Sequence, residues 1–122
     1  MAFLATIRPY GGPRVHPVTP ILGQGRLFVF MEPTSPKGKD LQRDGRYALH
    51  AAVENPGGGQ GEFCVSGCAR RVEEVETRSI AASASPYDPA ERYILFELEV
   101  EEAFSTVYGK EGPRRRHWKQ AR

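Results

Sequence analysis

Two lysines stand in the first turn of a short helix that the sequence predicts from Pro36 onward. Ser35 suits the N-cap position, because its side-chain oxygen can accept a hydrogen bond from a backbone N–H group of the first turn. Proline suits the first helical position. Lys37 and Lys39 then add charge to a helix end that already carries about half a positive charge. This arrangement is unfavourable unless an anion binds there, and phosphate is the simplest anion to expect.

A basic residue from another segment completes the expected anion site. Thr34, Ser35 and Lys37 form one half of a predicted phosphate clamp, and Arg14 is the candidate for the other half. The alternative interpretation is a solvated helix start whose lysines contact nothing. These residues alone do not separate the two interpretations.

The other chemistry-bearing residues form no catalytic or metal-binding pattern, so no catalytic residue and no metal site are predicted. The three histidines are spread over separate elements without ligand spacing: His16, His50 and His117. Cys64 and Cys68 lie in one predicted strand, about 13 Å apart along its axis, which is beyond disulfide reach. We expect both cysteines to be packing residues.

Length and composition indicate one globular domain, residues 1–122. Hydrophobic residues make up 39% of the chain and charged residues 26%, as in ordinary soluble domains. The formal charge of +2 is too small to favour a nucleic-acid partner. No apolar run reaches the roughly 18 residues of a membrane-spanning helix, and no signal-peptide pattern opens the chain. A cytoplasmic protein without a membrane partner is therefore expected.

Six strands and two short helices are predicted from hydrophobic periodicity and turn residues. The strands cover residues 2–9, 15–22, 27–32, 46–54, 61–73 and 92–108, and the helices cover 36–44 and 73–85. Residues 56–61 are predicted to form a glycine-rich loop and residues 110–122 a basic, solvated tail. Strands joined by hairpins, with two helices between them, predict an all-β-dominated antiparallel sheet that closes as a barrel.

Single positions refine this prediction. Gly45 is expected to end the first helix, and Gly67 to mark a bend or a close backbone approach. Alternation predicts three inward side chains in strand 61–73, namely Phe63, Val65 and Ala69. In the last strand it separates inward Phe96, Leu98 and Val100 from a solvated face of Glu97, Glu99 and Glu101.

Two prolines interrupt the predicted strand 15–22. Proline cannot donate a hydrogen bond to a neighbouring strand, so Pro17 and Pro20 leave nearby backbone groups without strand partners. One interpretation is an edge strand protected from aggregation. The other is a segment against which a planar, hydrogen-bonding ligand lies. Arg14, His16 and Val18 would share one face of it.

The ordered set of segments resembles a known family. LATIRPYGGPRVHPVTPI, GRLFVF, TSPKGKDLQRDGRYALH and GEFCVSGCARRVEE, in this order and spacing, resemble the FMN-binding split-barrel family. That family includes pyridoxamine 5′-phosphate oxidase-like proteins and deazaflavin-using relatives. The resemblance extends to about Tyr108. It implies a six-stranded antiparallel split β-barrel that forms a homodimer, with two flavin sites at the subunit interface.

The resemblance also implies roles for single residues. Arg14 and Lys37 match the phosphate-binding residues of the family, and Ser35, with Thr34, matches its phosphate-facing hydroxyls. Lys39 adds charge to the same turn. The segment along the isoalloxazine ring is matched by His16, Pro17, Val18 and Thr19, and positions that line the ring or ribityl chain are matched by Phe30 and Met31.

Three departures from the family pattern limit the expected activity. No helix precedes the first strand, Thr19 stands where pyridoxamine phosphate oxidase has a lysine, and residues 114–118 share residue types with its C-terminal substrate-holding Arg-x-His element but are not matched to it. Oxidation of pyridoxamine phosphate itself is therefore not expected. Trp118 either packs on the flavin of the partner or belongs to a solvated tail, and the tail is the favoured expectation.

Four functions remain open. The first is an FMN-dependent oxidoreductase acting on an unidentified small molecule, in which the cofactor carries the chemistry. The second is an F420-dependent reductase, whose acidic cofactor would suit Lys39 and Arg43. The third is a non-catalytic flavin-binding or haem-binding protein in which His16 or His50 matters. The fourth is nucleic-acid binding through the basic residues 114–119, which rests on one short run only.

Overall fold

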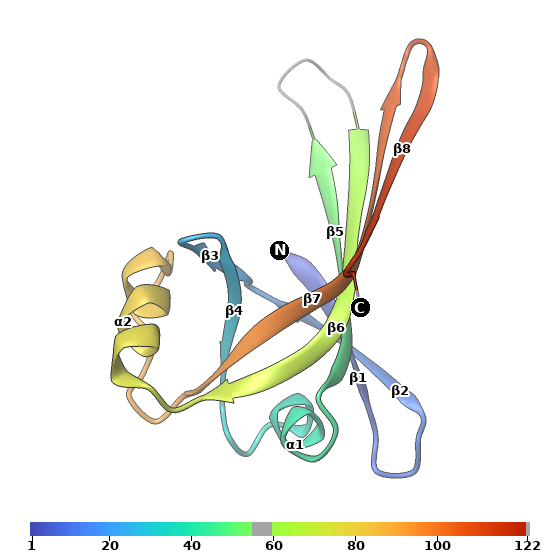
Figure 1. Cartoon of the computed structure of the whole chain (residues 1–122). Coiled ribbons are helices and arrows are strands. Elements are labelled where there is room, and N and C mark those ends of the chain that lie inside the picture. The colour runs from blue at the N-terminus through green and yellow to red at the C-terminus, as the bar shows by residue number, and fades with distance from the viewer. Residues whose placement is uncertain (55–59, 122) are drawn as a thin grey trace.

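The computed structural model describes residues 1–54 and 60–121. Eight strands and two helices are present in this part of the chain (Figure 1). The strands are β1 (Ala2–Ile7), β2 (Pro13–Val18), β3 (Ile21–Gly23), β4 (Arg26–Met31), β5 (Arg46–Glu54), β6 (Gln60–Val72), β7 (Ile94–Gly109) and β8 (Gly112–Lys119). The helices are α1 (Pro36–Arg43) and α2 (Val75–Ala84). Both helices therefore form where the sequence predicts them.

The strands form one antiparallel sheet in the order β2-β1-β5-β6-β7-β4-β3. β8 pairs with the C-terminal half of β7, on the edge that β6 does not occupy. The sheet curls into a barrel, with α1 at one end and α2 against the side formed by β3 and β4 (Figure 1). The long strands β5 to β8 continue beyond the barrel as a ribbon, and the β1–β2 hairpin extends at the opposite end. The all-β antiparallel barrel expected from the sequence is confirmed.

Two hydrophobic clusters hold the barrel together. The larger cluster fills its interior and includes Leu4, Val29, Leu49, Val65, Phe96 and Leu98. The smaller cluster lies beneath α2 and includes Ile21, Phe28, Phe30, Val72, Ala81 and Leu95. Alternation along β4 and β7 sends successive side chains into one cluster or the other, because successive residues of a strand face opposite sides of the sheet.

Two glycines shape the strands for a physical reason. Between β3 and β4 the chain turns in two residues, Gln24 (φ 51°) and Gly25 (φ 73°), and two positive φ angles match a type I′ hairpin. At Gly67 the register between β6 and β7 shifts, and a Cβ atom there would collide with the carbonyl oxygen of Glu99. The close backbone approach predicted for Gly67 is therefore confirmed.

The number of strands is larger than the six that the sequence predicts. The expected strand 15–22 divides into β2 and β3 at Thr19 and Pro20, because proline lacks the N–H group that would continue the ladder. The predicted tail, 110–122, is solvated over Gly112–Lys119, where every residue is exposed, but this segment is not irregular. That segment pairs with β7 as β8, and Trp118 lies opposite Ala103 with half of its side chain exposed. The strand signal is masked there because all residues of β8 are exposed and five of the eight are Arg, His or Lys.

Other single-residue predictions need correction. Gly45 follows the C-cap residue Asp44, where the sequence predicts it, but without a positive φ. Glycine is required there because a Cβ atom would lie 2.7 Å from the carbonyl oxygen of Ala69 on β6. Phe63 is 40% exposed rather than inward. Cys68 is exposed rather than packed, while Cys64 is half-buried. The predicted loop 56–61 lies mostly outside the described residues, and its last two residues begin β6.

Glu97 is not part of a solvated face. Its carboxylate receives two hydrogen bonds from Arg26, at 2.9 and 2.7 Å, and one from Arg70 at 3.0 Å. The hydrogen bond from Arg26 lowers the pKa of Glu97 in spite of its partial burial. The Arg26–Glu97 ion pair joins β4 to β7 on the outside of the barrel.

Candidate functional site

A cavity of about 430 Å³ opens where the ends of β2 and β4 meet the start of α1. It is lined by Met1, Pro17, Val18, Thr19, Phe30, Met31, Glu32, Ser35, Lys37, Tyr87 and Tyr93. The lining thus combines three of the predicted segments, 16–19, 30–31 and 34–37. Pro20 ends the pairing of β2 at this place, so the backbone that follows Val18 borders the cavity instead of a neighbouring strand.

The start of α1 is built around the side chain of Ser35. Its hydroxyl oxygen accepts a hydrogen bond from the backbone N–H of Gly38 at 3.1 Å, and its proton is donated to the carbonyl of Glu32 at 2.7 Å. The N-cap predicted for Ser35 is confirmed. Because its proton is used by Glu32 in this turn, Ser35 faces the cavity mainly as part of the cap.

Gly38 is a site residue that sequence reasoning missed. A Cβ atom on Gly38 would lie 2.8 Å from the carbonyl oxygen of Glu32 and 2.9 Å from the Ser35 hydroxyl oxygen. Only glycine lets the first turn of α1 pack this closely against the end of β4. The glycine three residues after a capping serine was the available signal.

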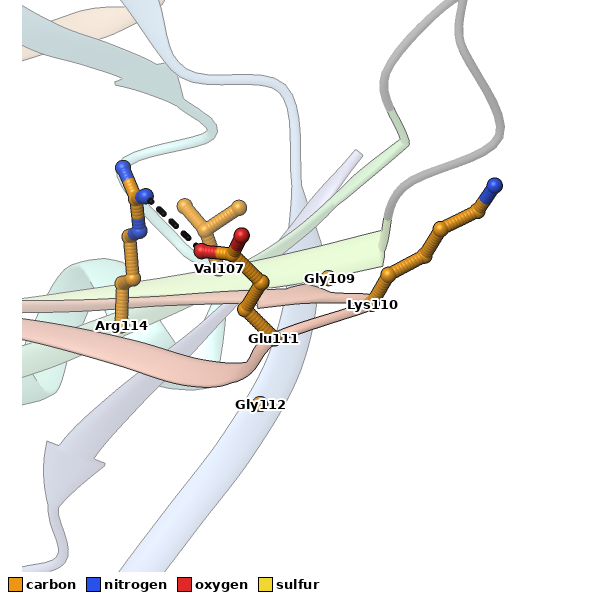
Figure 2. Close-up of a pocket in the computed structure, with 6 residues that line it drawn as sticks. All are labelled: Val107, Gly109, Lys110, Glu111, Gly112 and Arg114. Atoms are coloured by element: carbon orange, nitrogen blue, oxygen red, sulfur yellow. Dashed lines mark ion pairs between the residues drawn. The ribbon is translucent and has the colours of Figure 1, made fainter.

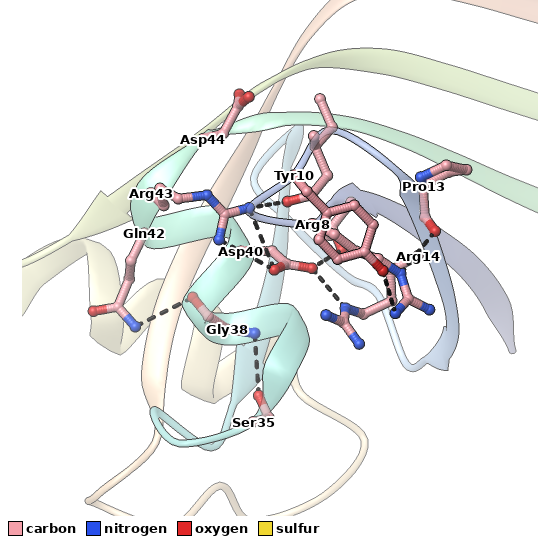
Figure 3. Close-up of polar contacts among 12 residues, drawn as sticks. Arg8, Tyr10, Pro13, Arg14, Ser35, Gly38, Asp40, Gln42, Arg43 and Asp44 are labelled. Atoms are coloured by element: carbon pink, nitrogen blue, oxygen red, sulfur yellow. Dashed lines mark hydrogen bonds and ion pairs between the residues drawn. The ribbon is translucent and has the colours of Figure 1, made fainter.

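Asp40 of α1 lies at the centre of a hydrogen-bond network that joins α1 to β1 and β2 (Figure 3). It is 1% exposed. One carboxylate oxygen, Oδ2, accepts hydrogen bonds from Arg14 Nε at 2.7 Å and from Thr6 Oγ1 at 2.8 Å. The other, Oδ1, faces Arg43 at 3.4 Å, and Arg43 also donates to the carbonyl of Ile7. No local pattern in the sequence indicates this network, because its residues come from three separate elements.

Burial by itself raises the pKa of Asp40, but the hydrogen bonds from Arg14 and Thr6 and the charge of Arg14 outweigh it and leave the pKa below its ordinary value. The carboxylate is therefore ionised at neutral pH. A buried carboxylate with several donors is stabilised in its charged form.

Positive charge dominates around this network. Burial, followed by the charges of Lys37, Arg14 and Arg8, lowers the pKa of His16, so its imidazole is neutral at pH 7. Within the described part of the chain, neither Lys37 nor Lys39 forms an ion pair. Asp40 thus offsets only part of the charge, and an anion would be attracted to the start of α1.

Not every predicted site residue lines the cavity. Arg14 and His16 occupy the same face of β2 as Val18 but lie further along the strand, where Arg14 meets Asp40. Thr34 and Lys39 are exposed beside the first turn of α1 and do not contribute to the lining. The structure therefore brings together most of the proposed ring-binding segment with Lys37 and Ser35, and leaves these four residues around it.

One wall of the cavity comes from a distant part of the chain. Tyr87 and Tyr93 belong to the loop between α2 and β7. Arg92 Nε donates to Glu32 Oε1 at 2.7 Å and so fastens this loop to the end of β4. Sequence reasoning missed both tyrosines because no local pattern places this loop beside β4.

Two further cavities contain none of the predicted site residues. One, of about 400 Å³, lies at the tip of the β7–β8 hairpin, where Arg114 pairs with Glu111 at 3.7 Å and Lys110 points away (Figure 2). The other, of about 640 Å³, lies at the barrel mouth between β3, β4, β5, β6 and β7 and is mostly apolar, with Arg26 and Glu97 at its edge.

An exposed aromatic row crosses the outer face of the sheet. The register places Pro17 opposite Phe3, Phe3 opposite His50, His50 opposite Cys64, Cys64 opposite Phe104, and Phe104 opposite His117. Phe3 is 50% exposed and Phe104 47% exposed. The Phe104 and His117 rings stack with their centroids 4.4 Å apart. We call these six residues the aromatic row; its Pro17 end borders the cavity.

Two absences concern the described residues only. Among them, no group of three or more His, Cys, Asp or Glu side chains could hold a metal ion. None of the helices found there has the length and apolar character needed to cross a membrane.

Comparison with known proteins supports the fold. No protein-family model matches the sequence, and curated proteins gave no significant match. Among solved structures, a haem-binding protein from Mycobacterium smegmatis matches with a TM-score of 0.77 and 20% identity, over 97% of this chain and 52% of that one. The chain therefore spans about half the length of that protein.

Two further structures widen the comparison. PhzG from Burkholderia lata, solved in complex with tetrahydrophenazine-1-carboxylic acid, matches with a TM-score of 0.72 and 17% identity, over 98% of this chain and 76% of that one. HutZ, the haem storage protein from Vibrio cholerae, matches with a TM-score of 0.61 and 15% identity, over 82% and 80%. The shared fold is the split barrel that the sequence predicts.

Proposed function

We propose that this protein binds FMN in the cavity beside α1, as a homodimer, and acts as a flavin-dependent oxidoreductase on a small molecule. The observation that carries the proposal is the convergence of segments 17–19, 30–31 and 35–37 on one cavity of about 430 Å³. These segments are separate in sequence, and the resemblance to the split-barrel family assigns each of them to flavin binding.

The phosphate of FMN is proposed to bind at the start of α1. Lys37 lines the cavity at this point, and α1 has no acidic residue in its first turn. The backbone N–H groups of a helix start attract an anion, and a neighbouring lysine strengthens that attraction. Arg14, Thr34 and Lys39 are assigned to the surroundings of the same phosphate.

The isoalloxazine ring is proposed to lie along His16 to Thr19. Apolar side chains of Val18 and Met31 offer one surface, and Tyr87 and Tyr93 offer another. A mostly apolar cavity with a few polar groups suits a planar ring with a polar edge. When bound, FMN supplies hydride transfer; the protein's residues hold and orient the ring and exclude water from it.

The homodimer is proposed to form across the aromatic row. Exposed aromatic side chains in a continuous strip are typical of an interaction surface. Because Pro17 belongs both to the row and to the cavity lining, a second copy placed on this face would border the cavity. This supports flavin sites at the subunit interface.

A visible absorbance spectrum of the purified protein, followed by titrations with FMN and F420, tests the proposal. Saturable binding of FMN with a shifted flavin spectrum is the expected result. If the protein binds F420 but not FMN, the proposed cofactor becomes the deazaflavin F420. Absence of a response to either flavin would remove the oxidoreductase proposal and leave only the fold.

Haem binding is the second candidate. Two structures that share the fold are haem-binding proteins by name, and the neutral imidazole of His16 has the form required of an iron ligand. Titration with haemin would then give a Soret band that His16→Ala abolishes. A Soret band that His16→Ala leaves unchanged would exclude His16 as the ligand.

A further inference from the structure

Asp40 holds the one arginine that the proposed function assigns to the FMN phosphate. Its carboxylate is 1% exposed and receives Thr6 Oγ1 and Arg14 Nε on the same oxygen, at 2.8 and 2.7 Å. Thr6 belongs to β1, Arg14 to β2 and Asp40 to α1, so the contact ties three elements together.

The geometry leaves the outer end of the guanidinium for another acceptor. Arg14 uses Nε toward Asp40, and its two terminal nitrogens point away from that carboxylate (Figure 3). Within the described residues, these terminal nitrogens donate no hydrogen bond. An arginine held by Nε can still present both terminal N–H₂ groups to a phosphate, for which two parallel hydrogen bonds are favourable.

Two opposite effects of Asp40 on an anion have to be compared. As a negative charge, it weakens the attraction of the site for phosphate. As a hydrogen-bond acceptor, it removes the rotational freedom of Arg14, which otherwise opposes binding. Arg43 also faces Asp40, and the charges of Lys37 and Arg8 reach His16 on β2, as does that of Arg14, so the site keeps a positive field and the second effect prevails.

We propose that Asp40 is a positioning residue that orients Arg14 for the phosphate of the cofactor and thereby makes the site selective for FMN over riboflavin, which lacks the phosphate. The inference rests on the proposed function. Riboflavin shares the ring and ribityl chain of FMN, so the ratio of the two dissociation constants isolates phosphate recognition from ring binding.

The test measures FMN and riboflavin affinity by fluorescence titration in the wild type, Asp40→Asn and Asp44→Asn. Asp44→Asn is the matched control, since it also removes one carboxylate at the end of α1. Asp44 pairs with Arg46 rather than with Arg14. We expect Asp40→Asn to weaken FMN about tenfold or more, the usual worth of one hydrogen bond to a charged group. Riboflavin affinity should stay within about twofold, and Asp44→Asn should not weaken FMN.

The direction of the change decides the outcome. If Asp40→Asn binds FMN as tightly as the wild type, or more tightly, the carboxylate acts only as a charge and the inference is overturned. A loss that is equal for FMN and riboflavin would show a general structural role and would overturn it too. Wild-type protein that binds neither flavin would instead contradict the proposed function.

A double-mutant cycle shows whether Asp40 acts through Arg14. Arg14→Ala should weaken FMN by itself, and adding Asp40→Asn should then have little further effect. Full additivity of the two losses would contradict positioning. If Asp40→Asn does not fold, the test uses Thr6→Val instead. The Thr6→Val substitution removes one hydrogen bond to Asp40 Oδ2 and leaves the negative charge of Asp40 in place. A folded Thr6→Val protein should bind FMN about threefold more weakly, and an unchanged FMN affinity would overturn the inference.

Discussion

Lys37 and Lys39 stand two positions apart at the start of α1, yet only Lys37 lines the cavity. We expect Lys37→Ala to weaken FMN binding about tenfold or more, because a hydrogen bond to a charged group contributes about 1.5–3 kcal/mol. Lys39→Ala is the matched control and should change the dissociation constant less than about threefold. Equal losses in the two variants, measured by fluorescence titration, would mean that overall charge rather than contact governs binding.

Asp40 makes the stability of the fold dependent on acid. Its pKa is lowered in the folded protein, because hydrogen bonds from Arg14 and Thr6 outweigh the effect of burial. The unfolded chain therefore binds the proton first, below about pH 3.8. Stability from this group is fully present above that pH and is lost as pH falls through the lowered pKa.

Urea unfolding between pH 6 and pH 3 measures this dependence. We expect the free energy of unfolding of the wild type to fall in the acid part of the range, and that of Asp40→Asn to fall less steeply. Asp44→Asn again serves for comparison, since the pKa of Asp44 is lowered to about 2 by an exposed pair with Arg46. Identical slopes for the wild type and Asp40→Asn would show that Asp40 contributes nothing to acid sensitivity.

Among the elements, the junction between β4 and α1 positions the candidate site. Its shape depends on Gly38, where a Cβ atom would come within 2.8 Å of the Glu32 carbonyl oxygen. Gly38→Ala is therefore expected to displace the first turn of α1 and to lower the free energy of unfolding by about 1–3 kcal/mol, as overpacking does. The FMN affinity should fall with it.

Gly109 offers a control for this substitution. A Cβ atom there meets nothing within 4 Å, at the tip of the β7–β8 hairpin. Gly109→Ala should leave both the thermal unfolding midpoint and the FMN affinity close to wild type. If Gly38→Ala were equally harmless, the tight packing of α1 against β4 would not be needed for the site.

For the whole molecule, the exposed aromatic row is the surface on which the proposed dimer depends. Phe104 lies in this row, stacked on His117 and nearly half exposed. We expect Phe104→Lys to shift the protein toward a monomer in sedimentation velocity experiments, because it places an unpaired charge in an apolar contact. The cofactor should be released at the same time, since the cavity borders this face.

Val75→Lys is the control for the dimer experiment. Val75 is 79% exposed at the start of α2 and lies outside the aromatic row. This variant should keep the wild-type sedimentation coefficient and FMN affinity. A Phe104→Lys monomer that binds FMN at full strength would contradict a site at the subunit interface.

The sequence by itself determined those features that depend on neighbours in the chain. Ser35, Pro36 and the residues after them predicted α1, because capping and proline preferences act within one turn. Alternation predicted the buried positions Phe96 and Leu98. The ordered set of segments, through its resemblance to the split-barrel family, predicted the fold, which is confirmed.

Only the tertiary structure decided what depends on barrel closure. Closure brings Tyr87 and Tyr93 beside β4 and places Asp40 between Arg14 and Thr6, contacts that join residues far apart in sequence. Pairing with β7 turns the polar segment Gly112–Lys119 into a strand against its own composition. Local pattern contains no information about such contacts, because they arise from packing between elements whose relative positions the whole sheet determines.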